Sequence, residues 1–167
     1  LPDICGAGAL VVAAKGEGTW YTPLNEEGDF RQLAASPCTE VAKARILRSL
    51  VSEHTNAEQI TELTTSLGIA PEPMQMDSQA KYAVLAAGEG EILLRLLSPK
   101  QPDYREKIWD QAAGSIVMEE AGGRVTDLDG KALDFSAGRA LDNNRGLLVT
   151  NGPLHEILLE GLRTIGA

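Results

Sequence analysis

The sequence of 167 residues is poor in cysteine, in aromatic residues and in positive charge. Its two cysteines, Cys5 and Cys38, are too few for a disulfide framework or a zinc cluster, and they favour a reducing, cytoplasmic location. No apolar run reaches the roughly 18 residues that a membrane-spanning helix needs. Fifteen Lys and Arg residues stand against 24 Asp and Glu residues, a net charge of −9, so no broad cationic surface for nucleic acid or a membrane is expected. Any anionic ligand must therefore be held by local positive charges.

The sequence also lacks the short motifs of several enzyme classes. It contains no G-x-S-x-G nucleophile motif, no Walker-type phosphate loop and no dinucleotide-binding glycine pattern. Its two histidines lie far apart in the sequence and do not form a metal site together. We expect His155 to be exposed in the last helix, whereas His54, in a polar loop, could stack on a base or hydrogen-bond to it. The first strand-like run begins only a few residues after Leu1, which suggests a piece of a longer polypeptide.

Strand and helix patterns alternate along the chain. The sequence predicts a β-hairpin over 8–24, an edge strand over 30–36, a buried strand over 91–97 and a strand over 145–150. The segment 44–51 fits neither period cleanly, and we favour a strand there. Helices are predicted over 56–67, 77–88 and 107–123, and after the Asn151-Gly152-Pro153 signal. This order predicts one α/β domain over residues 1–167, with a mixed β-sheet flanked by helices.

The predicted helix over 107–123 carries Asp110 near its N-terminus. Free backbone N–H groups and the helix dipole keep a carboxylate ionised at such a position. Asp110 could ligate a hard cation, or it could simply cap the helix, which is the commoner role of such an Asp. Ala112, Ala113 and Gly114 are small, so this turn can approach another backbone closely. The residues alone leave both roles of Asp110 open.

A second group of residues could bind an anion. If Asp77 caps the helix over 77–88, Ser78 and Lys81 share one face near its positive end, where a phosphate would be favoured. The alternative is a solvated helix face with an extended lysine. Arg95 interrupts an apolar strand, and a buried guanidinium needs a carboxylate, a phosphate or water as its partner. An internal salt bridge and a phosphate site therefore both stay open for Arg95.

Two segments, WDQAAGSIVMEEAGG and DSQAKYAVLAAGEGEILLRL, resemble signatures of the lithium-sensitive, magnesium-dependent phosphatases related to inositol monophosphatase. Together with YREKIWDQAAG and GTWYTPL they resemble, more narrowly, the 3'(2'),5'-bisphosphate nucleotidases over essentially the whole chain. The resemblance implies Mg²⁺ as the cofactor, Asp110 as a metal ligand in catalysis, and nucleotide contacts by His54, Ser78 and Lys81. It implies that Arg95 binds a phosphate, where inositol monophosphatases carry a glutamate, and a guanidinium favours a second phosphate on the substrate.

The family's first signature, D-P-[IL]-D-G-[TS], and its upstream metal-binding glutamates are missing from the sequence. A single carboxylate cannot hold two or three Mg²⁺ ions, which need octahedral oxygen shells. We therefore expect this chain to be the carboxyl-terminal domain of the fold, with the amino-terminal domain as its partner. Alone it should be inactive, and its uncovered apolar surface should favour self-association.

The expected substrate is a small bisphosphate nucleotide, 3'-phosphoadenosine 5'-phosphate, cleaved to AMP and phosphate. Two alternatives are an inositol phosphate phosphatase and a non-catalytic nucleotide-binding or interaction module.

Overall fold

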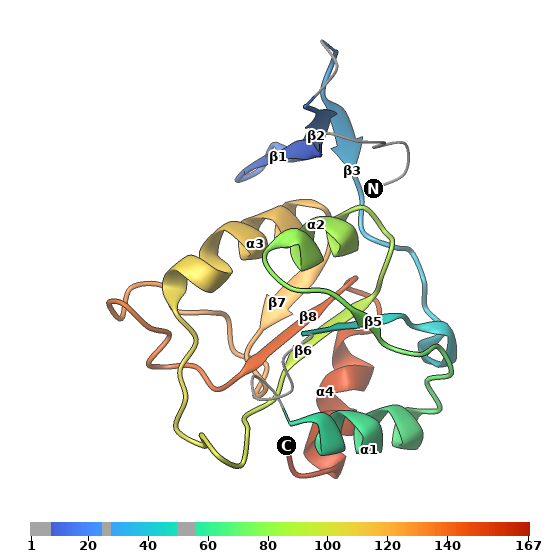
Figure 1. Cartoon of the computed structure of the whole chain (residues 1–167), viewed down its shortest axis with the longest axis vertical. Coiled ribbons are helices and arrows are strands. Elements are labelled where there is room, and N and C mark those ends of the chain that lie inside the picture. The colour runs from blue at the N-terminus through green and yellow to red at the C-terminus, as the bar shows by residue number, and fades with distance from the viewer. Residues whose placement is uncertain (1–7, 25–27, 50–55) are drawn as a thin grey trace.

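The computed structural model describes residues 8–24, 28–49 and 56–167. In this part of the chain, helices and sheets are stacked in alternating layers (Figure 1). Helices α1 and α4 cover one face of a five-stranded sheet, and α2 and α3 cover the other face. A three-stranded sheet packs on α3 from the far side.

The three-stranded antiparallel sheet has the order β1-β2-β3, formed by β1 (Ala9–Ala14), β2 (Gly18–Pro23) and β3 (Arg31–Leu33). The mixed sheet has the order β5-β4-β6-β8-β7, formed by β4 (Ile46–Arg48), β5 (Met74–Gln75), β6 (Ile92–Arg95), β7 (Arg124–Thr126) and β8 (Leu147–Thr150). Strand β4 runs parallel to β5 and β6, whereas β8 runs antiparallel to β6 and β7. The helices are η1 (Val41–Lys43, a 3₁₀ helix), α1 (Ala57–Leu67), α2 (Ala80–Ala86), α3 (Ile108–Glu120) and α4 (His155–Thr164). None of the helices in this part is long and apolar enough to cross a membrane.

Most of the predicted elements are present. Helix α1 begins after Asn56, whose side-chain oxygen accepts a hydrogen bond from the Gln59 N–H at 3.2 Å, and it ends at Gly68, whose φ of 66° lies in the left-handed region. The expected mixed sheet flanked by helices is confirmed, while the hairpin and the edge strand form a separate antiparallel sheet. The short strands β5 and β7 were not predicted, because two or three residues are too few to show a period of two.

The direction of each side chain on β6 decides where the functional pocket can form. Ile92 and Leu94 are fully buried in the cluster that contains α1 and α4, and Leu93 is buried in the cluster that contains α2 and α3. Because side chains alternate along a strand, Arg95 points to the same side as Leu93, toward α2 and α3. Arg95 is also the last residue of the strand, so its guanidinium lies at the carboxyl end of the central strand.

Helices α2 and α3 approach each other closely at Gly114. A Cβ atom added to Gly114 would lie 2.2 Å from the ring of Tyr82, which is 3% exposed. This distance is shorter than any van der Waals contact, so no larger residue fits without moving the two helices apart. Gly114 therefore allows the close approach that the sequence predicts, whereas Ala112 and Ala113, expected to share this role, are exposed.

We expect Gly114→Ala to lower the free energy of unfolding by about 1–3 kcal/mol, because the added methyl group overpacks the contact with Tyr82. Chemical denaturation of the purified chain measures the change. Gly28→Ala is the matched control, since its added Cβ would meet nothing within 4 Å. Equal stability of the two variants would show that α2 and α3 are not tightly packed.

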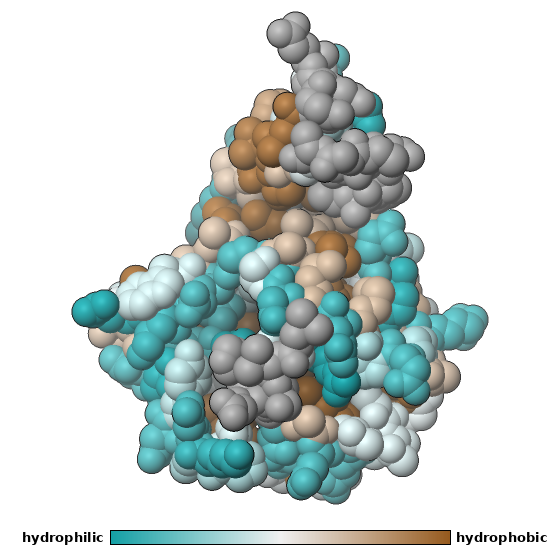
Figure 2. Space-filling model, in the orientation of Figure 1, coloured by the Kyte–Doolittle hydropathy of each residue, from teal (hydrophilic) through white to brown (hydrophobic). Residues whose placement is uncertain are grey.

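The three-stranded sheet is held on α3 by hydrogen bonds at its hairpin. The N–H groups of Gly16 and Gly18 donate to the Glu120 carboxylate at 2.8 Å and 2.9 Å, and these bonds lower the pKa of Glu120. Figure 2 shows apolar surface over this sheet. Its exposed large apolar side chains are Leu10 and Val12 on β1, with Leu24 directly after β2 and Phe30 directly before β3. An uncovered apolar surface was expected, and self-association of the chain remains a prediction.

The prediction that His155 is exposed was wrong. His155 is completely buried, and its two ring nitrogens lie 2.9 Å from the hydroxyl groups of Thr126 and Thr150. The imidazole thus bonds β7 and β8 to the first residue of α4. Burial, together with the positive charge of Arg124, lowers the pKa of His155 from 6.5 to about 4. Thr150 and Thr126 lie on two strands outside the last helix, so the pattern of that helix did not reveal them.

The buried His155 should make the fold sensitive to acid. Its pKa is lower in the folded chain, so the unfolded chain takes up the proton first as the pH falls below 6.5. The stabilisation is complete above pH 6.5, and about 3 kcal/mol is lost as the pH falls to 4. Denaturant titrations over this pH range should show a steeper loss for the wild type than for His155→Gln. Parallel curves would contradict the assignment.

Candidate functional site

Four of the five site residues predicted from the sequence line one pocket. The pocket has a volume of about 440 Å³, and Ser78, Lys81, Arg95 and Asp110 lie in its wall. It opens where β4, β5 and β6 end, between the mixed sheet and the first turns of α2 and α3. Ligand sites in open α/β sheets commonly occur at the carboxyl ends of strands. The fifth predicted residue, His54, lies outside the described residues.

Lys81 is the second residue of α2, and it is a nearly buried cation. Its side chain is 7% exposed, and within the described residues its ammonium group has no hydrogen-bond or ion-pair partner. Burial lowers the pKa of Lys81, and the nearby positive charge of Arg95 lowers it further. The ammonium group reaches the open pocket, where an anionic ligand would supply the missing partner and offset the cost of the partial burial.

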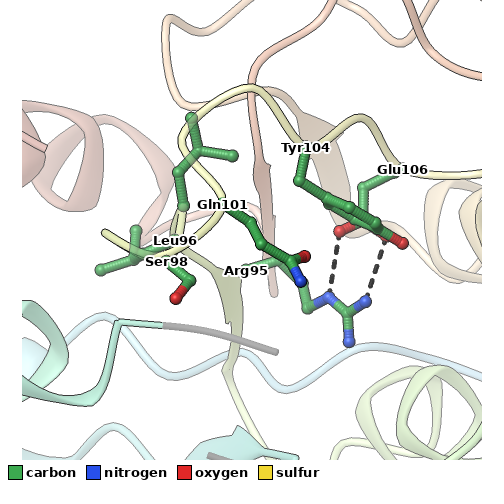
Figure 3. A pocket seen from close by; sticks show the side chains of 7 residues that line it. Arg95, Leu96, Ser98, Gln101, Tyr104 and Glu106 are labelled. Atoms are coloured by element: carbon green, nitrogen blue, oxygen red, sulfur yellow. Dashed lines mark hydrogen bonds and ion pairs between the residues drawn. The ribbon is translucent and has the colours of Figure 1, made fainter. Parts of the chain in front are cut away.

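Arg95 does have a partner inside the protein. Its Nε and Nη2 atoms donate to the two carboxylate oxygens of Glu106 at 3.1 Å and 3.3 Å. Although burial opposes it, the charge of Glu106 raises the pKa of Arg95. Figure 3 shows this pairing and a smaller adjoining pocket of about 180 Å³ between the guanidinium, Gln101 and Tyr104. The internal salt bridge is thus present, and Arg95 lines the larger pocket as well.

Asp110 belongs to the first turn of α3 but does not cap it. The N-cap position is occupied by Lys107, and Asp110 is the third residue of the helix. The side-chain amide of Gln79 donates to the backbone carbonyl of Asp110, which joins the start of α2 to the start of α3. The carboxylate of Asp110 is exposed in the pocket, where it is free to bind a ligand from solution.

The predicted role of Asp77 as a helix cap was wrong. Helix α2 begins three residues later, at Ala80, and the carboxylate of Asp77 instead accepts a hydrogen bond from the hydroxyl group of Ser49 at the end of β4. Ser78 has a positive φ of 70° and precedes the helix, and its hydroxyl oxygen accepts a hydrogen bond from the Ala80 N–H at 3.2 Å. Ser78 and Lys81 therefore meet at the pocket because of this turn and not because they share a helix face.

The described lining of the pocket has too few acidic side chains to hold a metal ion by itself. Its acidic lining residues are Asp77 and Asp110, and the described part of the chain holds no group of three side chains that could bind a metal ion. A carboxylate oxygen is the ligand type that Mg²⁺ and Ca²⁺ prefer, and these ions need six or more oxygen ligands. Asp110 can supply one such ligand, whereas the described residues by themselves do not complete the site.

Sequence reasoning missed three buried polar residues at the pocket, of which Tyr82 and Gln111 line it and Glu106 lies next to it. Glu106 accepts a hydrogen bond from the side-chain amide of Gln111 at 2.6 Å, and the Gln111 oxygen accepts one from the Tyr82 hydroxyl at 2.6 Å. All three side chains are less than 5% exposed. Burial raises the pKa of Tyr82, and the charge of Glu106 raises it further. A polar glutamine inside the apolar stretch of α3 was the one available signal, and it did not identify the partners.

The sequence model of the inositol monophosphatase family matches residues 4–167. The chain belongs to the inositol monophosphatase family. A curated relative from Emericella nidulans, named 3'(2'),5'-bisphosphate nucleotidase, is 35% identical over 162 residues, which are 96% of this chain and 46% of the relative. A relative of the same name from Oryza sativa is 39% identical over 156 residues, which are 93% of this chain and 42% of the relative. The chain thus spans less than half the length of these curated relatives.

The solved inositol monophosphatase from Anabaena (Nostoc) sp. PCC 7120 has a similar fold. It superposes with a TM-score of 0.68 at 24% identity, and the match covers 93% of this chain and 57% of that protein. Membership of the inositol monophosphatase family and its fold, both expected from the WDQAAG and DSQAKY segments, are therefore confirmed. The roles of His54, Ser78, Lys81, Arg95 and Asp110 remain predictions.

Lys81 should lose its proton at a lower pH than an ordinary lysine. We expect its pKa to lie below that of Lys43, which an exposed hydrogen bond to Glu40 raises. Binding of an anion to the pocket should weaken as the pH rises through the pKa of Lys81, because the ammonium charge is then lost. Nuclear magnetic resonance titration of the lysine side chains measures both groups, and titration of Lys81 at or above the pKa of Lys43 would contradict its burial.

Proposed function

We propose that the protein carrying this sequence is a divalent-metal-dependent phosphatase that hydrolyses the 3'-phosphate of 3'-phosphoadenosine 5'-phosphate, giving AMP and phosphate. The observation that carries the proposal is the meeting of Asp110, Lys81 and Arg95 in one pocket. The names of the curated relatives support the choice of substrate.

The proposed substrate has two phosphate groups, and the pocket offers two kinds of group to hold them. The two cations, Lys81 and Arg95, would hold the phosphate that is not cleaved, with the Ser78 hydroxyl beside them. The carboxylate of Asp110 would lie at the phosphate that is cleaved. Fixing the substrate at both ends reduces the entropy that is lost on reaching the reacting geometry, which lowers the barrier. His54 would contact the nucleotide.

The proposed metal is Mg²⁺, with Asp110 as one of its ligands. A bound divalent cation would supply positive charge next to the phosphoryl group that is transferred to water. We infer that the remaining ligands come from outside the described residues, from an amino-terminal domain that would be this chain's partner. Under this proposal the chain is the carboxyl-terminal domain and is inactive alone. A cytoplasmic location is also proposed, and it rests on the low cysteine content.

Two other functions are compatible with this site. An inositol phosphate phosphatase would use the same metal ligand, but a sugar ring gives the pair of cations no second phosphate to bind. A non-catalytic nucleotide-binding module is favoured by one observation, the incomplete set of metal ligands in the described part of the chain. Activity assays of the protein joined to or mixed with its amino-terminal domain separate these alternatives.

We expect the complete protein to release phosphate from 3'-phosphoadenosine 5'-phosphate in the presence of Mg²⁺ and to lose this activity when Mg²⁺ is chelated. Asp110→Asn should lower the rate about 100-fold or more, because a metal ligand is lost. Colorimetric assay of released phosphate measures both effects. Glu62→Gln, on the exposed face of α1 behind the mixed sheet, is the matched control and should leave the rate unchanged.

Faster hydrolysis of inositol 1-phosphate than of the nucleotide would reverse the substrate assignment. Nucleotide binding without hydrolysis of either substrate would favour the binding module.

A further inference from the structure

Glu106 lies next to the pocket, where it can fix the orientation of the Arg95 guanidinium. Glu106 is 4% exposed, and its two carboxylate oxygens accept hydrogen bonds side-on from Nε and Nη2, along one edge of the guanidinium. Figure 3 shows that the third guanidinium nitrogen of Arg95 is directed away from Glu106. The ion pair therefore uses one edge of the guanidinium and leaves the other edge available to a ligand.

Glu106 is itself held on several sides. Its carboxylate accepts the 2.6 Å bond from Gln111, which is bonded in turn to Tyr82, and its backbone carbonyl accepts from the Leu141 N–H at 2.9 Å. These contacts come from α3, from α2 and from the loop before β8. The carboxylate thus has little freedom to move, and its two hydrogen bonds restrict the orientation of the Arg95 guanidinium.

We propose that Glu106 is a positioning residue, which fixes the free edge of Arg95 toward the second phosphate of the substrate. The proposal rests on the proposed function. Glu106 also offsets one of the two positive charges, so that Lys81 and Arg95 can remain charged side by side in one pocket. Removal of Glu106 has two opposite effects on the binding of an anion, one electrostatic and one conformational. It makes the pocket more positive, which favours an anion, and it releases the guanidinium, which must then be ordered again at each binding event.

The positioning effect should exceed the gain in positive charge. In Glu106→Gln an amide nitrogen replaces one carboxylate oxygen, so a donor faces the donors of Arg95 and Gln111. The side-on pair cannot then form, and the free edge of the guanidinium loses its direction. A residue that only stabilises the fold would affect all substrates alike, whereas Glu106 should affect only substrates that have a second phosphate.

A second ion pair in the same protein provides a matched control. Glu91 is 2% exposed and accepts from Nε and Nη2 of Arg45 at 3.1 Å and 2.7 Å, which is the same side-on geometry. It lies next to the opposite end of β6 and lines none of the described pockets. Glu91→Gln therefore removes a side-on ion pair of a buried glutamate with a more exposed arginine, without touching Arg95.

The test compares 3'-phosphoadenosine 5'-phosphate with adenosine 3'-phosphate, which lacks the second phosphate. For Glu106→Gln in the complete protein we expect KM for the bisphosphate to rise about tenfold, with kcat within about threefold. The kinetic constants for adenosine 3'-phosphate should change less than about twofold. Gln111→Met, which leaves the ion pair but removes its support, should give a smaller change in the same direction, and it replaces Glu106→Gln if that variant does not fold.

Two results would overturn the proposal: equal losses on both substrates in Glu106→Gln, or the same selective loss in Glu91→Gln. If the wild-type protein hydrolyses neither nucleotide, the proposed function fails, and titration with inorganic phosphate then decides the role of Glu106. Phosphate binding at least fivefold weaker in Glu106→Gln than in Glu91→Gln, by calorimetry at about pH 7.5, supports positioning. Equal affinities in the two variants overturn it.

Discussion

The contact between Tyr82 and Gly114 is the constraint on which the functional pocket depends. It brings α2 and α3 so close that the Tyr82 hydroxyl reaches Gln111, and through Gln111 the carboxylate of Glu106. The same contact places the first turns of the two helices side by side, so that Lys81 and Asp110 enter one pocket. Strand β6 supplies the third group, since its alternation turns Arg95 toward these helices. Packing thus assembles a charged site from three separate elements.

The charges of the site are balanced locally in a protein that is acidic as a whole. Two cations line one open pocket, and partial burial together with the charge of Arg95 lowers the pKa of Lys81. Glu106 compensates Arg95, whereas Lys81 has no partner among the described residues. An anion that enters the pocket therefore finds one oriented cation and one cation that lacks a partner. This arrangement favours a phosphate ligand without any wider basic surface.

Much of this could be predicted from the sequence, but only where the signal is local. Helix α1 is flanked directly in the sequence by its capping residue, Asn56, and its terminating glycine, Gly68. The WDQAAG and DSQAKY segments indicate the family. Asp77 was wrongly expected to cap α2 because it bonds to Ser49, which follows β4 and is 28 residues away in the sequence. His155 was misjudged and Glu106 was missed for the same reason, since their partners Thr126 and Arg95 lie on separate strands. Local patterns thus identified the residues in the pocket wall, and the fold alone revealed those that support it.

The central claim is that the groups at positions 78–81, 95 and 110 face one ligand. Titration of the isotope-labelled protein with 3'-phosphoadenosine 5'-phosphate in Mg²⁺-free buffer, followed by nuclear magnetic resonance, tests it most directly. The account predicts that the largest shift changes occur at the Lys81 ammonium, the Arg95 guanidinium and the backbone of Asp110 and Gln111. Changes confined to another surface, such as the hollow between Asn56, Arg145 and Ala167, would contradict it.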